Sequence, residues 1–248
     1  MNLRAVAIGG ASNPNTLIVG DGGTALTLPA AGPGKAGEGL AATVTFEPNA
    51  FLRIGADNSV TVISKHLEMG QGTYTGLATI LAEELDADWK QVRVEGAPAD
   101  AKRYNNLFWG PAQGTGGSTA MANSWEQMRQ AGAAARAMLV SAAARRWQVP
   151  AGEIAVSEGV VSHAASKRKA SFGELASAAA AEAVPASVTL KDPKDFRLIG
   201  KHAHRKDSAA KTNGTAQFTQ DMHLPGMLVA VVAHPPRFGG KVKSFDAA

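Results

Sequence analysis

The chain of 248 residues contains no cysteine. It therefore holds no disulfide, no thiolate-bound zinc and no cysteine-ligated iron–sulfur cluster, so any redox centre must be a bound cofactor or lie on another chain. No stretch approaches the roughly 18 apolar residues that cross a bilayer, and we expect no membrane span. The 25 basic residues are scattered among 21 acidic ones, which argues against a nucleic-acid partner.

Residues typical of hydrolytic or metal-dependent catalysis are also scarce. None of the six histidines belongs to an HExxH motif. We expect them at the surface or in loops. His202 and His204 alternate as metal ligands on a strand can, but no third ligand stands nearby. The serines lack a GxSxG turn. Glu83 and Glu84 would point about 100° apart on a helix, which indicates either a solvated face or a buried salt link.

The N-terminal segment differs in composition from the rest of the chain. Residues 1–45 are rich in Gly, Ala, Pro, Ser and Thr without helical or strand periodicity, and we interpret them as a leader or linker. A single basic residue, Arg4, precedes an interrupted apolar stretch, which is not the pattern of an intact secretory signal. A degraded export signal remains an alternative.

The next part of the chain has an α+β pattern. Alternating apolar residues around a turn predict a hairpin at 51–63, and apolar residues at helical spacing predict a helix at 77–85 capped by Thr73 or Thr75. The same criteria predict a strand at 92–94, an alanine-rich helix at 119–147, a hairpin at 154–163, a basic turn at 167–169 and a helix with a capping box at 171–182. The inward residues of the long helix are predicted to be Trp125, Met128, Ala135, Met138 and Leu139. Residues 46–184 thus form one unit.

The remaining residues suggest a connection and a second domain. Residues 185–196 are interpreted as a linker that contains a strand fragment at 188–190. Strand-like runs separated by glycine and proline follow at 196–199, 215–218 and 227–233. They predict that a small domain begins at residue 197 and continues to residue 248.

Two glycine-rich segments each lead into a predicted helix. In the first, Glu68-Met-Gly-Gln-Gly-Thr73, the glycines allow a tight turn, and the helix N-terminus would face an anion such as phosphate. The Gln71 amide both donates and accepts, which suits the edge of a heterocycle. An ordinary strand-to-helix turn explains the same residues, so that alternative stays open.

The second segment lies between an aromatic pair and the long helix, and comprises Gln113, Gly114, Thr115, Gly116, Gly117, Ser118 and Thr119. It lacks the spacing of a Walker loop and of GxGxxG, and a flexible loop with a Ser/Thr N-cap explains it equally well. The pair Phe108-Trp109 is more typical of a core or a pocket wall than of a stacking platform. Two such segments together would offer amides and small hydroxyls to a phosphate-rich ligand.

These segments, with Ala82-Glu-Glu-Leu85 between them, resemble the molybdopterin-binding large subunit of the xanthine dehydrogenase and aldehyde oxidase family, specifically its isoquinoline 1-oxidoreductase β-subunit type. The similarity continues through 191–200, 213–216 and 224–228, and covers residues 46–248. It implies an α+β fold, in which a partial molybdopterin-binding domain of hairpins, glycine-rich turns and helices is followed by a truncated α/β hammerhead domain.

The resemblance also implies a function. It is a molybdenum-dependent hydroxylation of an N-heterocycle or aldehyde with oxygen from water, with electrons leaving through a small iron–sulfur subunit. The implied cofactor is a molybdopterin cytosine dinucleotide that this chain binds only in part. Its pterin or phosphates would contact Gly70, Gln71, Gly72 and Thr73, and the segment 113–119 would hold the dinucleotide. The family's catalytic glutamate lies in the remainder of the large subunit, outside this chain, so no catalytic residue or metal ligand is assigned.

Three interpretations follow from the resemblance. The chain is part of an enzyme subunit, or a non-catalytic cofactor-binding or assembly half of a split subunit, or a truncated, inactive gene product. The family favours the periplasm, while the visible N-terminus fits the cytoplasm as well. The sequence does not identify the substrate, because most of the pocket walls would come from outside this chain.

Overall fold

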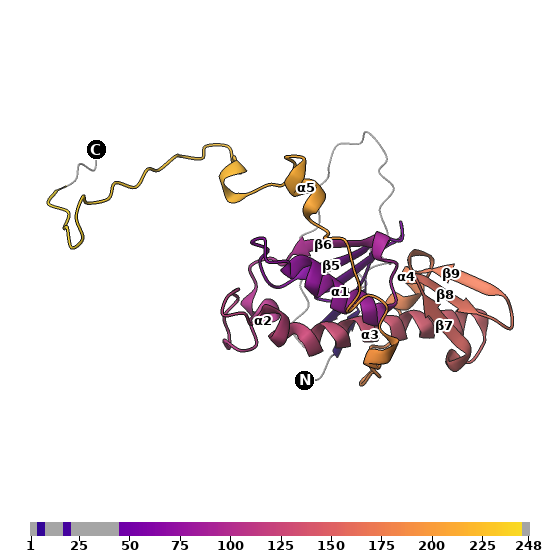
Figure 1. Ribbon diagram of the computed structural model, residues 1–248. Helices are drawn as coiled ribbons and strands as arrows, with labels where there is room; N and C mark the ends of the chain where they lie inside the picture. Colours follow the sequence, from indigo (N-terminus) through magenta and orange to yellow (C-terminus); the bar gives the residue numbers. More distant parts are fainter. Residues whose placement is uncertain (1–3, 8–16, 21–44, 245–248) are drawn as a thin grey trace. The chain divides into compact units, whose positions relative to one another are not determined.

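The computed structural model describes residues 4–7, 17–20 and 45–244, with side chains from Ala50 onward (Figure 1). The chain divides into two compact units, one up to Ser208 and one from Ala209. Most of the proposed leader lies outside the described residues. Within it, however, the backbone forms the strands β1 (Arg4–Ala7) and β2 (Leu17–Gly20), which the sequence analysis did not predict. Strands of four residues are too short to show a clear alternation.

The first unit is built on a six-stranded mixed sheet whose strands stand in chain order. The other four strands are β3 (Thr45–Asn49), β4 (Leu52–Gly55), β5 (Val60–Ser64) and β6 (Val92–Gly96). The pairs β2–β3 and β5–β6 are parallel, and the other three are antiparallel. The predicted hairpin is confirmed, with Leu52 opposite Val62. Every residue of β5 is buried, so this strand runs through the core.

The helices are α1 (Thr73–Leu85), α2 (Ala101–Tyr104), α3 (Ala120–Trp147), α4 (Phe172–Ala180) and α5 (Ser208–Thr212). All four apolar residues that predicted α1 are buried, as are four of the five predicted inward residues of α3. The fifth prediction, Trp125, is wrong. Its side chain is 37% exposed because its ring packs beside the Phe196 ring and the Arg129 guanidinium, outside the core. No described helix is both long and apolar enough to cross a membrane.

Helices α1 and α3 pack side by side and run in the same direction. Gly76 in the first turns of α1 faces Met121 at the start of α3, and Asp86 at the end of α1 binds Arg136 farther along α3. Between these contacts, Gly132 lets the helices approach closely, since a Cβ there would lie 2.4 Å from a backbone carbonyl oxygen of α1. The N-termini of the two helices therefore lie at the same end of the unit.

A smaller antiparallel sheet follows α3, made of β7 (Ile154–Ser157), β8 (Val160–His163) and β9 (Arg168–Ser171). The predicted hairpin turn is present, with positive φ at Glu158 and Gly159. The prediction of a basic turn at 167–169 is only partly correct. Lys167 lies in the turn, but Arg168 and Lys169 belong to β9 and pair with β8. Ser171 forms the predicted capping box with Glu174 and begins α4.

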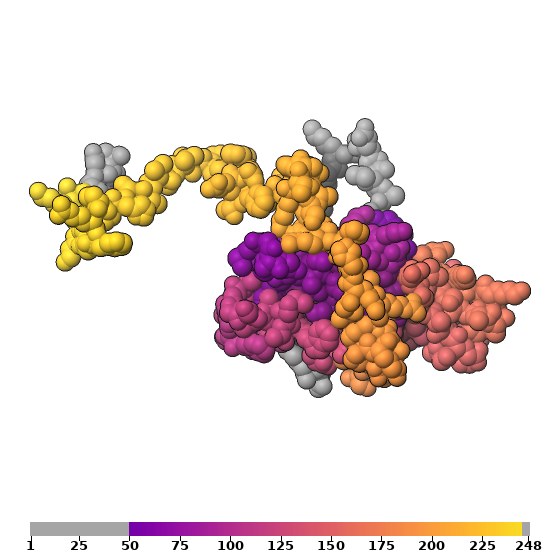
Figure 2. Space-filling model, viewed as in Figure 1, coloured from indigo at the N-terminus to yellow at the C-terminus, as the bar shows by residue number. Residues whose placement is uncertain are grey.

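Residues 187–207, which we call the strap, run over the surface of α1 and α3, where Figure 2 shows them in orange. The strap contains the 3-10 helix η3 (Pro193–Asp195) and no strand. The strands predicted at 188–190 and 196–199 are therefore wrong. For the second of these there is a clear reason, since the backbone N–H groups of Arg197, Leu198 and Ile199 donate to the Glu83 carboxylate rather than to a neighbouring strand.

The described part of the second unit contains most of α5 and the 3-10 helix η4 (Thr219–Asp221), and it contains no strand. The strands predicted at 215–218 and 227–233 are wrong for this structure. Leu228, Val229 and Val231 are 91%, 87% and 90% exposed. A strand needs a neighbouring strand to satisfy its backbone, and no described residue of this unit provides one.

Candidate functional site

The structure brings the two glycine-rich segments together. We call Glu68–Thr73 the first loop and Gln113–Thr119 the second loop. The backbone N–H of Leu67 donates to the Thr115 hydroxyl over 2.9 Å, and Nδ1 of His66 lies 3.1 Å from the Gly114 carbonyl oxygen. The first loop leads into α1 and the second loop leads into α3. Because these two helices are parallel, both loops lie at the same end of the helix pair.

The first loop is a tight turn that needs its glycines. Gly70 and Gly72 have φ values of 105° and 95°, a region that side chains disfavour. The Gln71 side chain is folded back onto the loop, where Oε1 accepts from the Met69 N–H at 2.6 Å and Nε2 donates to the Leu67 carbonyl at 2.8 Å. In this conformation, the Gln71 amide therefore supports the turn.

The N-terminus of α1 is capped by a carboxylate that the sequence analysis did not single out. Glu68 Oε1 accepts from the N–H groups of Gly70 at 2.7 Å and Gly72 at 3.1 Å, and Oε2 accepts from Tyr74 at 3.1 Å. Burial alone would raise the Glu68 pKa, but these three hydrogen bonds bring the pKa below its usual value. The prediction that Thr73 or Thr75 caps α1 is wrong, because Gly72 is the N-cap residue and the Glu68 carboxylate accepts from the Gly72 and Tyr74 amides.

The second loop is fixed at its start and packed against an aromatic ring. Gln113 accepts from the Asp100 N–H at 2.9 Å and donates to the Pro98 carbonyl at 3.0 Å. A Cβ on Gly114 or Gly116 would lie 2.5 or 3.1 Å from the Trp109 ring, so both glycines make room for this ring. Trp109 is 44% exposed, which places it along the loop rather than in the core.

The start of α3 has free capping capacity. Thr119 is its N-cap residue, but the hydroxyl donates to the Gly116 carbonyl at 2.8 Å and accepts from Asn106 at 2.7 Å, and no side-chain bond reaches the helix amides. The prediction of a Ser/Thr cap is therefore right in position and wrong in its hydrogen bond. Gly117 and Ser118 both have positive φ, 59° and 56°. The N-terminus of α3 therefore has no charged capping group and is bordered by small residues, so its backbone N–H groups can bind an anion.

A buried polar cluster beneath the loops was missed by the sequence analysis. His66 is 1% exposed, and its Nε2 lies 3.0 Å from Asn123 Nδ2. Of the two expected locations for a histidine, the surface is therefore wrong for His66, whereas the loop is right, since His66 lies in a bend after β5. Lys65 is 2% exposed and donates to Gln127 at 2.7 Å. Burial lowers the pKa of both, and brings that of Lys65 to about 8. The sequence did contain one indication that Lys65 and His66 are buried, namely that they directly follow the apolar strand β5.

A second buried histidine serves a structural role. His163 is 4% exposed, with Nδ1 2.7 Å from the Ser166 hydroxyl and Nε2 2.9 Å from Glu153. His202 and His204 lie in the strap with their rings 5.2 Å apart. Among the residues with described side chains, no group of three or more His, Asp or Glu has the geometry to hold a metal ion.

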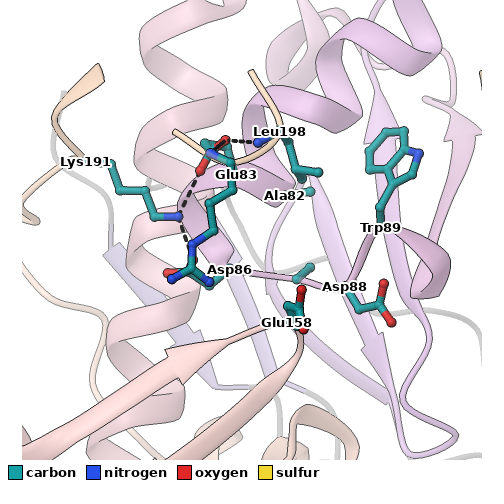
Figure 3. Close-up of a pocket in the computed structure, with 10 residues that line it drawn as sticks. Ala82, Glu83, Asp86, Asp88, Trp89, Glu158, Lys191 and Leu198 are labelled. Atoms are coloured by element: carbon teal, nitrogen blue, oxygen red, sulfur yellow. Dashed lines mark hydrogen bonds and ion pairs between the residues drawn. The ribbon is translucent and has the colours of Figure 1, made fainter. Parts of the chain in front are cut away.

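The carboxylates at the end of α1 fasten the strap (Figure 3). Lys191 donates to Glu83 at 2.9 Å and to Asp86 at 2.6 Å, and Arg129 donates to Glu84 at 2.7 Å. Of the two alternatives predicted for Glu83 and Glu84, the buried salt link is therefore confirmed and the solvated helix face is wrong. Burial would raise the Glu83 pKa, but Lys191 and the backbone N–H donors of the strap lower it overall. A pocket of about 180 Å³ beside this cluster is lined on one side by Trp89.

The sequence is similar to known proteins. A family model described as the molybdopterin cofactor-binding domain matches residues 23–234. The chain belongs to this family. The beta subunit of isoquinoline 1-oxidoreductase from Brevundimonas diminuta is 38% identical over 86% of this chain and 31% of its own length. The membrane-bound aldehyde dehydrogenase [pyrroloquinoline-quinone] from Gluconacetobacter polyoxogenes is 37% identical, with 81% and 26% covered. A nicotinate dehydrogenase subunit from Pseudomonas putida is 33% identical, with 76% and 15% covered.

Two facts follow from the comparison. The family resemblance seen in the sequence is confirmed, and with it the mixed α and β architecture and a molybdenum cofactor as the ligand class of this domain. The chain spans less than a third of the length of each of these relatives.

The two loops fit a phosphate-bearing cofactor unequally. The N-terminus of α3 has no side-chain cap, whereas the N-terminus of α1 already binds the Glu68 carboxylate.

Proposed function

We propose that the chain forms part of the large subunit of a molybdenum hydroxylase, which oxidises an N-heterocycle or an aldehyde with oxygen taken from water. The observation that carries this proposal is the pairing of two glycine-rich loops at the shared end of two parallel helices. The names of the relatives, which refer to isoquinoline, nicotinate and aldehyde, support the substrate classes. Substrate contacts and the catalytic base are assigned to the rest of the subunit.

The cofactor is proposed to be a molybdopterin cytosine dinucleotide, which when bound supplies the redox chemistry of the reaction. The residues of this chain bind and orient it. The second loop, Gln113–Thr119, holds the dinucleotide at the uncapped start of α3, and Gly70, Gln71, Gly72 and Thr73 of the first loop line the pterin end. A small iron–sulfur subunit is the proposed electron acceptor, since a chain without cysteine cannot hold such clusters by thiolates.

In the domain organisation that we propose, residues 46–184 are the cofactor-binding part, 185–196 connect, and 197–248 begin the hammerhead domain. Support comes from the exposed apolar run 227–233, which has the composition of a buried strand and needs neighbouring strands to become one. Strands from the rest of a longer subunit would meet that need.

The test is the cofactor content of the chain. We would purify it from a molybdenum-replete host, with and without the rest of a full-length subunit, and measure molybdenum and cytidine nucleotide by mass spectrometry. Ser118→Asp places a negative charge at the start of α3 and should reduce the content at least tenfold. The control Gly152→Asp adds the same charge in an exposed turn with open space around it, and should leave the content unchanged.

The outcomes separate the interpretations. No cofactor in any of these preparations would contradict the proposal. Cofactor in an assembled subunit that oxidises neither heterocycles nor aldehydes would favour the non-catalytic assembly half. Equal loss from Ser118→Asp and Gly152→Asp would contradict the assignment of the dinucleotide to the second loop.

A further inference from the structure

The N-terminus of α1 is filled by a charged group of the chain itself. A helix N-terminus combines unpaired amides with partial positive charge, which is why anions bind there. Here the Glu68 carboxylate takes three of the local N–H donors, and its side chain is only 3% exposed. An incoming phosphate would have to remove these hydrogen bonds and would meet like charge.

The strap holds this carboxylate from outside. Arg205 Nη2 lies 3.2 Å from Glu68 Oε1, and Nη1 donates to the Gly70 carbonyl at 3.0 Å. Asp207 orients the guanidinium by accepting from Nε at 3.0 Å and from Nη2 at 2.9 Å. Arg205 therefore contacts both the capping group and the backbone of the first loop.

The neighbouring strap residue fixes the register of this contact. The Lys206 N–H donates to the Thr75 hydroxyl at 3.1 Å, and its ammonium lies 4.1 Å from the centroid of the Trp89 ring. Burial lowers the Lys206 pKa. These two attachments hold the residue next to Arg205 against α1 and Trp89, and Arg205 itself contacts the first loop.

We infer that Glu68 is a permanent internal anion of the first loop, and that Arg205 is the positioning residue that keeps it there. The first loop therefore excludes phosphate and receives an uncharged, hydrogen-bonding part of a ligand, while phosphates go to the second loop. The division between the loops rests on the proposed function. The exclusion of anions from α1 does not, since it follows from contacts within the chain.

To test the exclusion, we would titrate the full 248-residue chain with inorganic phosphate and with acetate, and monitor binding by the NMR chemical shifts of the backbone amides. In the wild-type protein, the amides of Gly70, Gly72 and Tyr74 should not respond to either anion. Glu68→Ala opens the site, so the same amides should shift saturably, with acetate binding at least tenfold tighter than to the wild type. Amide shifts of β7 to β9 report whether the variant is folded.

Two results would overturn the inference. One is a response of the Gly70 and Gly72 amides to phosphate in the wild-type protein, which would make Glu68 displaceable. The other is a folded Glu68→Ala variant that binds no acetate. Neither experiment uses a molybdopterin, so their failure is distinguishable from failure of the proposed function.

The role of Arg205 has its own readout. Arg205→Gln should raise the Glu68 pKa, measured by carboxyl carbon shifts, and Arg205→Lys should restore part of the difference. The control Lys194→Gln removes another exposed strap cation, which pairs with Asp192, and should leave the Glu68 pKa as it was. An unchanged Glu68 pKa in Arg205→Gln would refute the positioning role, and this measurement remains available if Glu68→Ala does not fold.

Discussion

The backbone N–H of Leu67, directly before the first loop, donates to the side-chain hydroxyl of Thr115 in the second loop over 2.9 Å, and so joins residues that are 48 positions apart in sequence. Thr115→Val keeps the shape of the side chain and removes the acceptor. We expect the free energy of unfolding to fall by about 1 kcal/mol and hydrogen exchange at Leu67 to accelerate. Ser118→Ala removes an exposed hydroxyl from the same loop and should leave Leu67 exchange unchanged. Equal exchange in both variants would mean that this bond does not hold the loops together.

Glu83 should be the main fastening point of the strap. Glu83→Ala leaves the Lys191 ammonium and three backbone N–H groups without that acceptor. Removing one partner of a buried ion pair typically costs about 3 to 5 kcal/mol, and hydrogen exchange should rise from Arg197 to Ile199. Glu126→Ala, which removes an exposed carboxylate from α3, should cost less than about 0.5 kcal/mol. A similar small loss in both variants would contradict this role of Glu83.

Lys65 should make stability rise with pH in the alkaline range. Its folded-state pKa of about 8 lies below the usual 10.5. Between these values the unfolded chain holds a proton that the folded chain has released, so the free energy of unfolding increases with pH, by about 3 kcal/mol at most. Denaturant unfolding of Lys65→Met should lack this increment, and the difference from wild type isolates Lys65. Lys102→Met, at an exposed position, should retain the rise.

The close packing of α1 on α3 depends on Gly132. In Gly132→Ala, the new Cβ would lie 2.4 Å from a backbone oxygen, which cannot move aside as a flexible side chain can. We expect a loss of roughly 1 to 3 kcal/mol, the usual cost of overpacking, measured by thermal or denaturant unfolding. Gly152→Ala meets nothing within 4 Å and should be close to neutral. If both variants were neutral, the helices would not be in contact at this point.

Local signals predicted local structure. The spacing of Leu77, Ile80, Leu81 and Leu85 is a property of one helix face, and the Ser171–Glu174 capping box forms within a single turn. Both could be predicted because the interacting groups lie a few residues apart. The family resemblance also came from contiguous motifs, and it was confirmed.

The features that the sequence did not predict depend on distant partners. Ile199 looks like part of a strand, but its N–H donates to a glutamate 116 positions earlier. The expected Thr73 cap was replaced by Glu68, whose carboxylate reaches over the turn that Gly70 and Gly72 allow. His66 is buried beneath the second loop and against Asn123 of α3, both of which are far from it in sequence. In each case the residue type was visible, while its partner was set by tertiary packing.

The strap also has a consequence for how the protein is made. Glu83 and Leu198 are 115 positions apart, so at typical rates of about 5 to 20 residues per second the ribosome adds Glu83 roughly 6 to 23 s before it adds Leu198. During that interval the Glu83 carboxylate lacks Lys191 and the strap amides, which are its partners in the folded structure. Docking of the strap then brings these partners to the carboxylate, which makes burial of Glu83 a late step in the biosynthetic folding of the first unit.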